Sequence, residues 1–240
     1  MDWFKAAMSK IQVVKAILIL VLVLVVPGFL YYLLVAEGKN RYHPLPVYGP
    51  KQVAKTTHRV NGKDVADTVY HTLPDFKLAD QDGNPVSLKT FDKKIFIAGF
   101  FYTRCHGVCE LMNSNVNQLV TNYAKNNMVY FVSVTVDPDW DSSPVLKKYA
   151  ATFKPASARW LFLTGDTSAI YNLARKGFLV NAMQTGNNDF IYSEKLMLID
   201  DGKRIRGYYN GASADDVNRL NDEIKVLISE EILKNDTPLY

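Results

Sequence analysis

The sequence predicts an α/β domain with a mixed central sheet, preceded by one transmembrane helix. Three observations support this prediction. Residues 16–36 carry no charge, apolar runs at 94–103 and 128–136 flank a helical pattern, and a hairpin pattern followed by a helical one closes the chain. With 48% hydrophobic and 22% charged residues among 240, the composition excludes a disordered or collagen-like chain.

Residues 16–36 are long enough to cross a membrane as a helix. At about 1.5 Å per residue, the segment covers the roughly 30 Å hydrocarbon core of a bilayer. A cleaved signal peptide is the alternative, but its apolar region is about 7 to 15 residues long and ends in small residues. Leu34 stands before Ala36, where a small residue is expected. We therefore predict a membrane anchor.

The flanking charges weakly favour a cytoplasmic N-terminus. Three lysines lie within residues 1–15, whereas Lys39 and Arg41 follow the helix. Because residues 1–15 leave little room for a transit peptide, the sequence predicts a single-pass bacterial inner-membrane protein with its C-terminal domain in the periplasm. A mitochondrial membrane is the alternative.

The rest of the chain predicts a tether and one domain. Residues 37–50 hold three prolines and two glycines without an apolar period, which is typical of an extended tether. Residues 51–236 are long enough to bury a core, and 237–240 form a short tail. The formal charge of +4 is too small for a nucleic-acid surface, so we expect no nucleic-acid partner.

Two turn dipeptides indicate hairpins near the start of the domain. Asn-Gly stands at 61–62 and Asp-Gly at 82–83. Both dipeptides favour the positive backbone angles of two-residue hairpin turns. We therefore expect small hairpins over residues 60–65 and 78–88.

A strand, a helix and a second strand follow. The apolar runs at 94–103 and 128–136 do not alternate with polar residues, as expected for central strands covered on both faces. Between them, apolar residues recur at helical spacing from 109 to 126. This order predicts a crossover helix joining two parallel strands.

The second half of the domain completes a recognisable order of elements. We expect a helix at 142–153 capped by Ser142, a strand at 160–164, a helix at 167–176, a hairpin of 195–200 with 205–209, and a final helix from 213. Together with the first half, these elements predict a thioredoxin-like fold, a central mixed sheet flanked by helices.

Cys105 and Cys109 are the two cysteines of the chain, and they stand where a strand ends and a helix begins. The N-terminus of a helix stabilises thiolates, so both sulfurs should be reactive. Residues four apart on a helical turn have Cα atoms near 6 Å, which a disulfide accepts. A purely structural bridge is the alternative, but closing so short a loop contributes only about 2 kcal/mol. Redox or metal chemistry is favoured.

Two thiolates select Cu(I) among biological metals, and a third ligand would complete the site. His106 is the tentative third ligand because it adjoins Cys105. Met112 shares the helical face of the cysteines, but a methionine on such a stripe is more often part of the core. The other histidines, His43, His58 and His71, are interpreted as solvated or satisfied by hydrogen bonds.

Several motifs along residues 74–227 resemble the Sco/SenC family. They are Pro74-Asp75-Phe76, Asp80-Gln81-Asp82-Gly83, the run from Phe100 through Cys109, Ser133-Val134-Thr135-Val136-Asp137-Pro138, and Leu198-Ile199-Asp200. The resemblance implies a membrane-tethered, thioredoxin-like copper chaperone that serves assembly of the copper centre in cytochrome c oxidase. A membrane-embedded oxidase subunit, or its copper-free site, is the implied partner.

In that family two cysteines and a distant histidine bind copper. The resemblance carries the cysteine roles onto Cys105 and Cys109, whereas the position that matches the histidine is Tyr192. A phenol is a poor Cu(I) ligand because its oxygen is hard and mostly protonated near pH 7. His106 and Glu110 stand where the family often has proline. These departures weaken the case for stable copper binding and leave thiol chemistry intact.

Two functions remain open at this point, besides a scaffold with neither activity. The first is copper delivery to, or thiol maturation of, cytochrome c oxidase through the Cys105/Cys109 pair. The alternative is a thiol–disulfide oxidoreductase without stable copper binding, which needs only the two cysteines and the helix end. We expect Cys105, nearer the strand end, to be the attacking cysteine.

Overall fold

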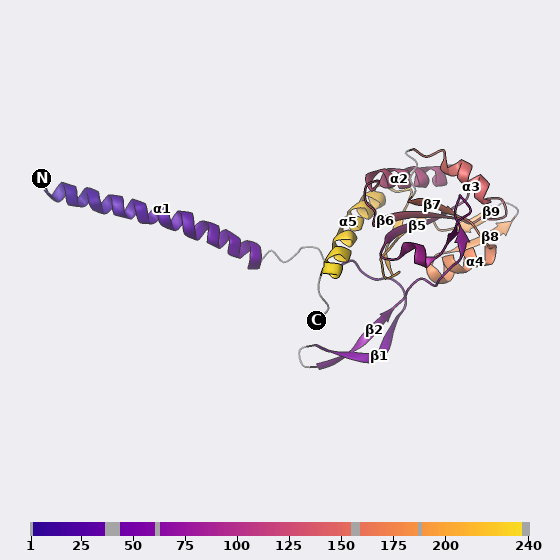
Figure 1. Ribbon diagram of the computed structural model, residues 1–240, viewed down its shortest axis with the longest axis horizontal. Helices are drawn as coiled ribbons and strands as arrows, with labels where there is room; N and C mark the ends of the chain where they lie inside the picture. The colour runs from indigo at the N-terminus through magenta and orange to yellow at the C-terminus, as the bar shows by residue number, and fades with distance from the viewer. Residues whose placement is uncertain (1, 37–43, 61–62, 155–158, 187–188, 237–240) are drawn as a thin grey trace. The chain divides into compact units, whose positions relative to one another are not determined.

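The computed structural model describes residues 2–36, 44–60, 63–154, 159–186 and 189–236, which fold as two compact units divided after residue 43 (Figure 1). In the first unit, α1 (Asp2–Ala36) is a single helix with Pro27 inside it. Its segment Val13–Tyr32 has a mean hydropathy of 2.9 and none of it is buried, so it is long and apolar enough to cross a membrane.

The second unit is built on a five-stranded sheet in the order β11-β10-β5-β6-β7. The strands are β5 (Ile95–Phe101), β6 (Val129–Thr135), β7 (Trp160–Leu163), β10 (Lys195–Ile199) and β11 (Ile205–Asn210). β5, β6 and β7 run parallel, whereas β10 runs antiparallel to both β5 and β11. The predicted mixed sheet and its central strand–helix–strand unit are confirmed.

Helices cover both faces of β5. The helices α2 (Val108–Asn122), α3 (Ser143–Ala150) and α5 (Ala214–Asp236) share one core with Ile95, Ile97 and Phe101 of β5. The helix α4 (Thr167–Asn172) shares the other with Phe96, Ala98 and Phe100. Every residue of β5 is buried, which explains why its sequence shows no polar alternation.

Four short strands and two long ones form three hairpins outside the main sheet. They are β1 (Lys51–Val60) with β2 (Lys63–Tyr70), β3 (Leu78–Ala79) with β4 (Pro85–Val86), and β8 (Ala182–Gly186) with β9 (Asp189–Tyr192). The first two confirm the turn predictions, although the Asn-Gly dipeptide itself lies outside the described residues and its hairpin is longer than expected. The hairpin of β8 and β9 was not predicted.

Two helical details differ from the sequence prediction. The helix expected at 167–176 is α4 followed by a π-helical turn over Leu173–Gly177. A separate short 3₁₀ turn, which was not predicted, lies at Leu88–Phe91. Ser142 does stand at the N-cap of α3, but its side chain makes no capping hydrogen bond. Proline in the first turn of α3 still favours a helix start there.

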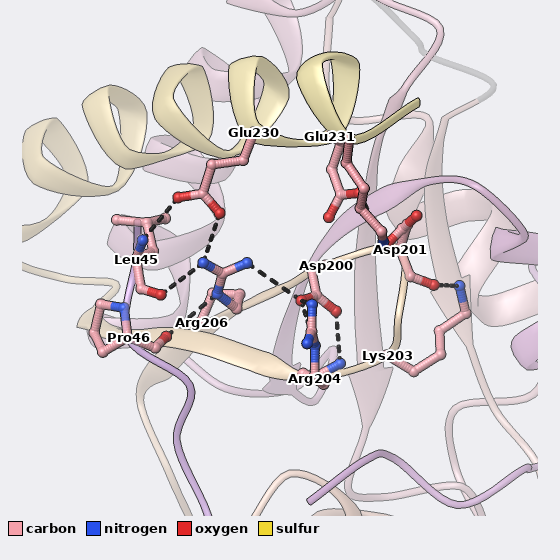
Figure 2. A network of polar contacts seen from close by, with 10 residues as sticks. Leu45, Pro46, Asp200, Asp201, Lys203, Arg204, Arg206, Glu230 and Glu231 are labelled. Carbon is pink, nitrogen blue, oxygen red and sulfur yellow. Dashed lines mark hydrogen bonds and ion pairs between the residues drawn. The ribbon is translucent and has the colours of Figure 1, made fainter. Parts of the chain in front are cut away.

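A buried network joins the start of the second unit to β11 and α5 (Figure 2). We call Asp200, Arg204, Arg206 and Glu230 the arginine network. Arg206 donates to Glu230 at 2.6 Å, to Asp200 at 3.3 Å, and to the carbonyl oxygen of Leu45 at 2.6 Å. Residues 44–50, expected to belong to the tether, therefore contact the domain where the structure describes them.

Candidate functional site at the end of strand β5

Cys105 and Cys109 form a disulfide that joins the loop after β5 to the first turn of α2. Their Cα atoms are 5.9 Å apart, so the predicted closeness of the pair is confirmed. Gly107 has a φ of 72°, a left-handed conformation that favours glycine, and this turn lets the chain enter α2 at Val108. Cys105 is 8% exposed and Cys109 only 1%, so Cys105 is the more accessible sulfur-bearing residue.

A buried carboxylate fixes the loop that leads to Cys105. Asp141 accepts hydrogen bonds from the backbone N–H of Thr103 at 3.0 Å and from the hydroxyls of Thr103 and Thr135. Burial raises the pKa of Asp141, and these hydrogen bonds oppose that increase. The carboxylate thus links the ends of β5 and β6 and restrains the backbone two residues before the disulfide.

Arg104 lies beside Cys105 and is held from two sides. Its guanidinium pairs with Asp137 at 2.5 Å and lies 4.5 Å from the centroid of the Trp140 ring. Asp137 is buried, whereas Trp140 is exposed. The positive charge next to Cys105 is therefore fixed in place by a carboxylate and an aromatic ring.

Tyr192 contacts both sulfurs from β9. Its hydroxyl oxygen lies 2.6 Å from Sγ of Cys109 and 3.3 Å from Sγ of Cys105. A disulfide carries no S–H, so the tyrosine hydroxyl is the donor in both contacts. Burial, followed by the nearby Tyr102 and Glu194, raises the pKa of Tyr192 to about 12. The phenol therefore keeps its proton at physiological pH.

The position of Tyr192 depends on the unpredicted hairpin. Tyr192 pairs with Ala182 across β8 and β9, and its ring packs edge-on against Tyr102 with centroids 5.9 Å apart. Tyr102 also packs against Phe190 of the same hairpin. The Asn-Asn dipeptide at 187–188 between two alternating segments was the available signal for this hairpin. We call Cys105, Cys109 and Tyr192 the cysteine site.

The other ligand candidates have contacts of their own. The imidazole of His106 is exposed, and its Nδ1 lies 3.2 Å from Oε1 of Glu110. Met112 is buried in the core beneath α2, and His71 contacts the carbonyl oxygen of Gly177 at 2.7 Å. His43 and the side chain of His58 lie outside the described residues. Among the residues that are described, no group of three or more His, Cys, Asp or Glu could hold a metal ion.

Comparison with known proteins places the chain in a family. The family model described as SCO1/SenC matches residues 65–229, which is more than half of the chain. The chain belongs to the SCO1/SenC family. The predicted family and the thioredoxin-like fold are thereby confirmed, whereas the alignment of Tyr192 with the family's histidine stays a prediction.

Individual Sco relatives agree with this assignment. The SCO1 protein homolog of Bacillus subtilis is 27% identical over 167 residues, covering 68% of this chain and 86% of that protein. A SCO1/SenC family lipoprotein from Bacillus anthracis is 28% identical, with a TM-score of 0.62 over 65% of this chain and 95% of its own. BsSco, described as a member of the Sco family of cytochrome c oxidase assembly proteins, is 28% identical, with a TM-score of 0.58 over 64% and 91%.

Proposed function

We propose that this Sco protein is a membrane-anchored thiol–disulfide exchange protein that matures the copper site of cytochrome c oxidase through Cys105 and Cys109. One observation carries the proposal. The two cysteines are bridged at the end of β5, and the group that approaches both sulfurs is a protonated phenol rather than a metal ligand. The family supports the choice of partner, because BsSco is described as one of the cytochrome c oxidase assembly proteins.

The exchange proceeds in two balanced steps. The Cys105 thiolate attacks a disulfide in the copper-free oxidase site, forms a mixed disulfide and releases one partner thiolate. The Cys109 thiolate then attacks the Cys105 sulfur, closes the Cys105–Cys109 disulfide and releases the second partner thiolate. Two electrons pass to the partner. A dithiol reductant of the same compartment then supplies two electrons that reduce the Cys105–Cys109 disulfide again. The greater exposure of Cys105 supports its role as the attacking cysteine.

The apolar helix supports a role beside a membrane enzyme. A segment such as Val13–Tyr32 anchors the domain near a membrane-embedded oxidase subunit, and we place the domain on the periplasmic side of a bacterial inner membrane. The Bacillus anthracis relative is described as a lipoprotein, so that relative is itself associated with a membrane. The tether that the sequence predicts over residues 37–50 does not extend to Leu45 and Pro46, which contact the domain.

Copper delivery is the second candidate, with Cu(I) as cargo. Sco homologues have been solved with copper bound, and two sulfurs this close suit a soft cation once the pair is reduced. The third position fits poorly, because Tyr192 retains its proton and phenol oxygen is a hard ligand. His106 could serve only after leaving Glu110 and turning toward the sulfurs.

A Cu(I) titration separates the two candidates. The reduced full-length chain competes anaerobically with a chelator for Cu(I), alongside Tyr192→His, His106→Ala and the control His71→Ala. We expect weak binding by the parent chain and His106→Ala, and tighter binding by Tyr192→His, because an imidazole then faces both sulfurs. Tight binding by the parent that is lost in His106→Ala alone would favour copper delivery instead.

An assay in cells tests the oxidase role. Replacing Cys105 and Cys109 with serine should lower the copper content of the host's cytochrome c oxidase, because the cysteines of the oxidase copper site then remain oxidised. If the chain supplies electrons, a membrane-permeant dithiol restores the oxidase and added copper does not. Rescue by copper alone would contradict thiol maturation.

A further inference from the structure

The two sulfurs of the disulfide are not equivalent in their surroundings. The hydroxyl of Tyr192 is 0.7 Å nearer to Sγ of Cys109 than to Sγ of Cys105, from 2.6 and 3.3 Å. Cys109 is also more deeply buried, at 1% exposure against 8%. The hydroxyl therefore lies closer to the sulfur of Cys109, while Cys105 is the more exposed residue.

We propose that Tyr192 directs thiol–disulfide exchange to Cys105 by donating a hydrogen bond to the sulfur of Cys109, which departs as a thiolate. The inference rests on the proposed function and adds a residue that selects the reacting sulfur. An incoming thiolate bonds to Sγ of Cys105, the Cys105–Cys109 bond breaks, and its electron pair stays on Sγ of Cys109. The products are one mixed disulfide on Cys105 and one thiolate on Cys109, so atoms and charge balance.

The hydrogen bond strengthens as the reaction proceeds. In the disulfide the acceptor sulfur is neutral, whereas negative charge develops on it when the sulfur–sulfur bond breaks. A hydrogen bond to an ionised acceptor is roughly twice as strong as one between neutral groups. The donor therefore stabilises the transition state and the thiolate more than the disulfide, which speeds departure of Cys109. The same difference favours the reduced state at equilibrium.

Packing holds the hydroxyl in place before the reaction. The Tyr192 ring stands perpendicular to that of Tyr102, which directly follows β5. Just after Tyr192, the backbone N–H of Ser193 donates to the carbonyl oxygen of Asn181 at 3.1 Å. The first contact holds the Tyr192 ring beside the residues that lead to Cys105, and the second closes the hairpin, so little reorganisation is needed when charge develops.

Reduction of the full-length oxidised chain by glutathione in detergent tests the inference. The mixed disulfide is trapped with acid and located by mass spectrometry, and the equilibrium constant for reduction is measured in parallel. For the parent chain we expect glutathione on Cys105. For Tyr192→Phe we expect glutathione on both cysteines, slower reduction by about tenfold and an equilibrium constant lower by about tenfold, which corresponds to about 30 mV for this two-electron couple.

Two further proteins separate the hydroxyl from the ring. Tyr208→Phe also loses one tyrosine hydroxyl hydrogen bond, the one to the carbonyl oxygen of Phe178, and should behave like the parent. Site-specific 3-fluorotyrosine at position 192 keeps the ring and provides a stronger donor, so reduction should be faster than in the parent. This variant keeps the test valid if Tyr192→Phe folds poorly.

The outcomes distinguish the two proposals. If Tyr192→Phe and the 3-fluorotyrosine protein both match the parent in the position of glutathione, the rate of reduction and the equilibrium constant, the role of Tyr192 is overturned. Thiol exchange itself would remain in place. A parent disulfide that glutathione cannot open at all would overturn the proposed function and this inference together.

Discussion

At the end of the sheet where β5 begins, buried and partly buried charged side chains are paired, whereas at the end where β5 finishes a reactive disulfide contacts a neutral hydroxyl. In the arginine network, Arg206 is 95% buried against Asp200 and Glu230 (Figure 2). In the cysteine site, the contacts of Tyr192 are to sulfurs that change their charge on reduction. The two sites lie at opposite ends of β5. Because β10 runs antiparallel to β5 and Ile199 pairs with Phe96, Asp200 lies near the start of β5, whereas Cys105 follows its end.

The difference separates stability from chemistry. Breaking a buried ion pair leaves an uncompensated charge, so the arginine network should be essential for the fold. The disulfide closes a very short loop, so it constrains the unfolded chain only weakly. The cysteine site can therefore open and close without endangering the domain, which a redox cycle requires.

Removing Arg206 should produce the largest loss of stability. We expect Arg206→Ala to lower the free energy of unfolding by about 3–5 kcal/mol, since the buried Asp200 and the partly buried Glu230 each lose an ion-pair partner. Thermal or urea unfolding of the full-length chain in detergent measures the change. Arg219→Ala is the matched control, because Arg219 pairs with Asp216 and Glu223 on the surface.

The control sets the scale for this comparison. Exposed ion pairs contribute about 0–1 kcal/mol, so Arg219→Ala should stay within that range. If Arg206→Ala and Arg219→Ala lower the free energy of unfolding equally, burial of Arg206 does not determine its contribution to stability. Below its unfolding transition, Arg206→Ala should still reduce and reoxidise Cys105 and Cys109 as the parent does.

Opening the disulfide should have a smaller effect on stability. We expect the variant with Cys105→Ser and Cys109→Ser to lose about 2 kcal/mol relative to the oxidised parent, the value for closing a loop of this length. Unfolding of the variant, the oxidised parent and the reduced parent under the same conditions measures it. A loss as large as that of Arg206→Ala would contradict the separation of stability from chemistry.

Local sequence patterns were sufficient to predict most of the fold. The runs that became β5 and β6 were readable because both faces of each strand are covered by helices. The hairpin of β8 and β9 was missed because its strands are short and most of their residues are exposed, so its hydrophobic pattern is weak. The early end of α4 and its π-helical turn carry no clear sequence signal.

The site was predictable only in part. The closeness of Cys105 and Cys109 follows from their spacing along the chain. The contact of Tyr192 with Cys109 spans 83 positions, and only the family resemblance pointed to it. In the arginine network, Arg206 pairs with Glu230, and both bind the backbone of Leu45. No periodicity in the sequence relates these three residues, so the network could not be predicted.

Near the arginine network, Glu231 should make stability depend on pH. Burial, followed by a hydrogen bond with Asp201, raises the pKa of Glu231 from 4.5 to about 7. The folded chain therefore binds a proton that the unfolded chain releases between these values, so stability falls as pH rises from about 4.5 to about 7 and then levels off. The ammonium of Lys234 lowers the pKa of Glu231 and so limits the increase to about 7.

Unfolding of the oxidised full-length chain from pH 5 to pH 8 measures this dependence. Glu231→Gln should remove the decline, because its amide stays neutral throughout, whereas Glu110→Gln at an exposed position should retain it. The oxidised cysteine site adds no slope in this range, since a disulfide does not titrate and the pKa of Tyr192 is about 12. An undiminished decline in Glu231→Gln would show that the pH dependence arises elsewhere. The contrast in stability between the arginine network and the cysteine site would then rest on Arg206 alone.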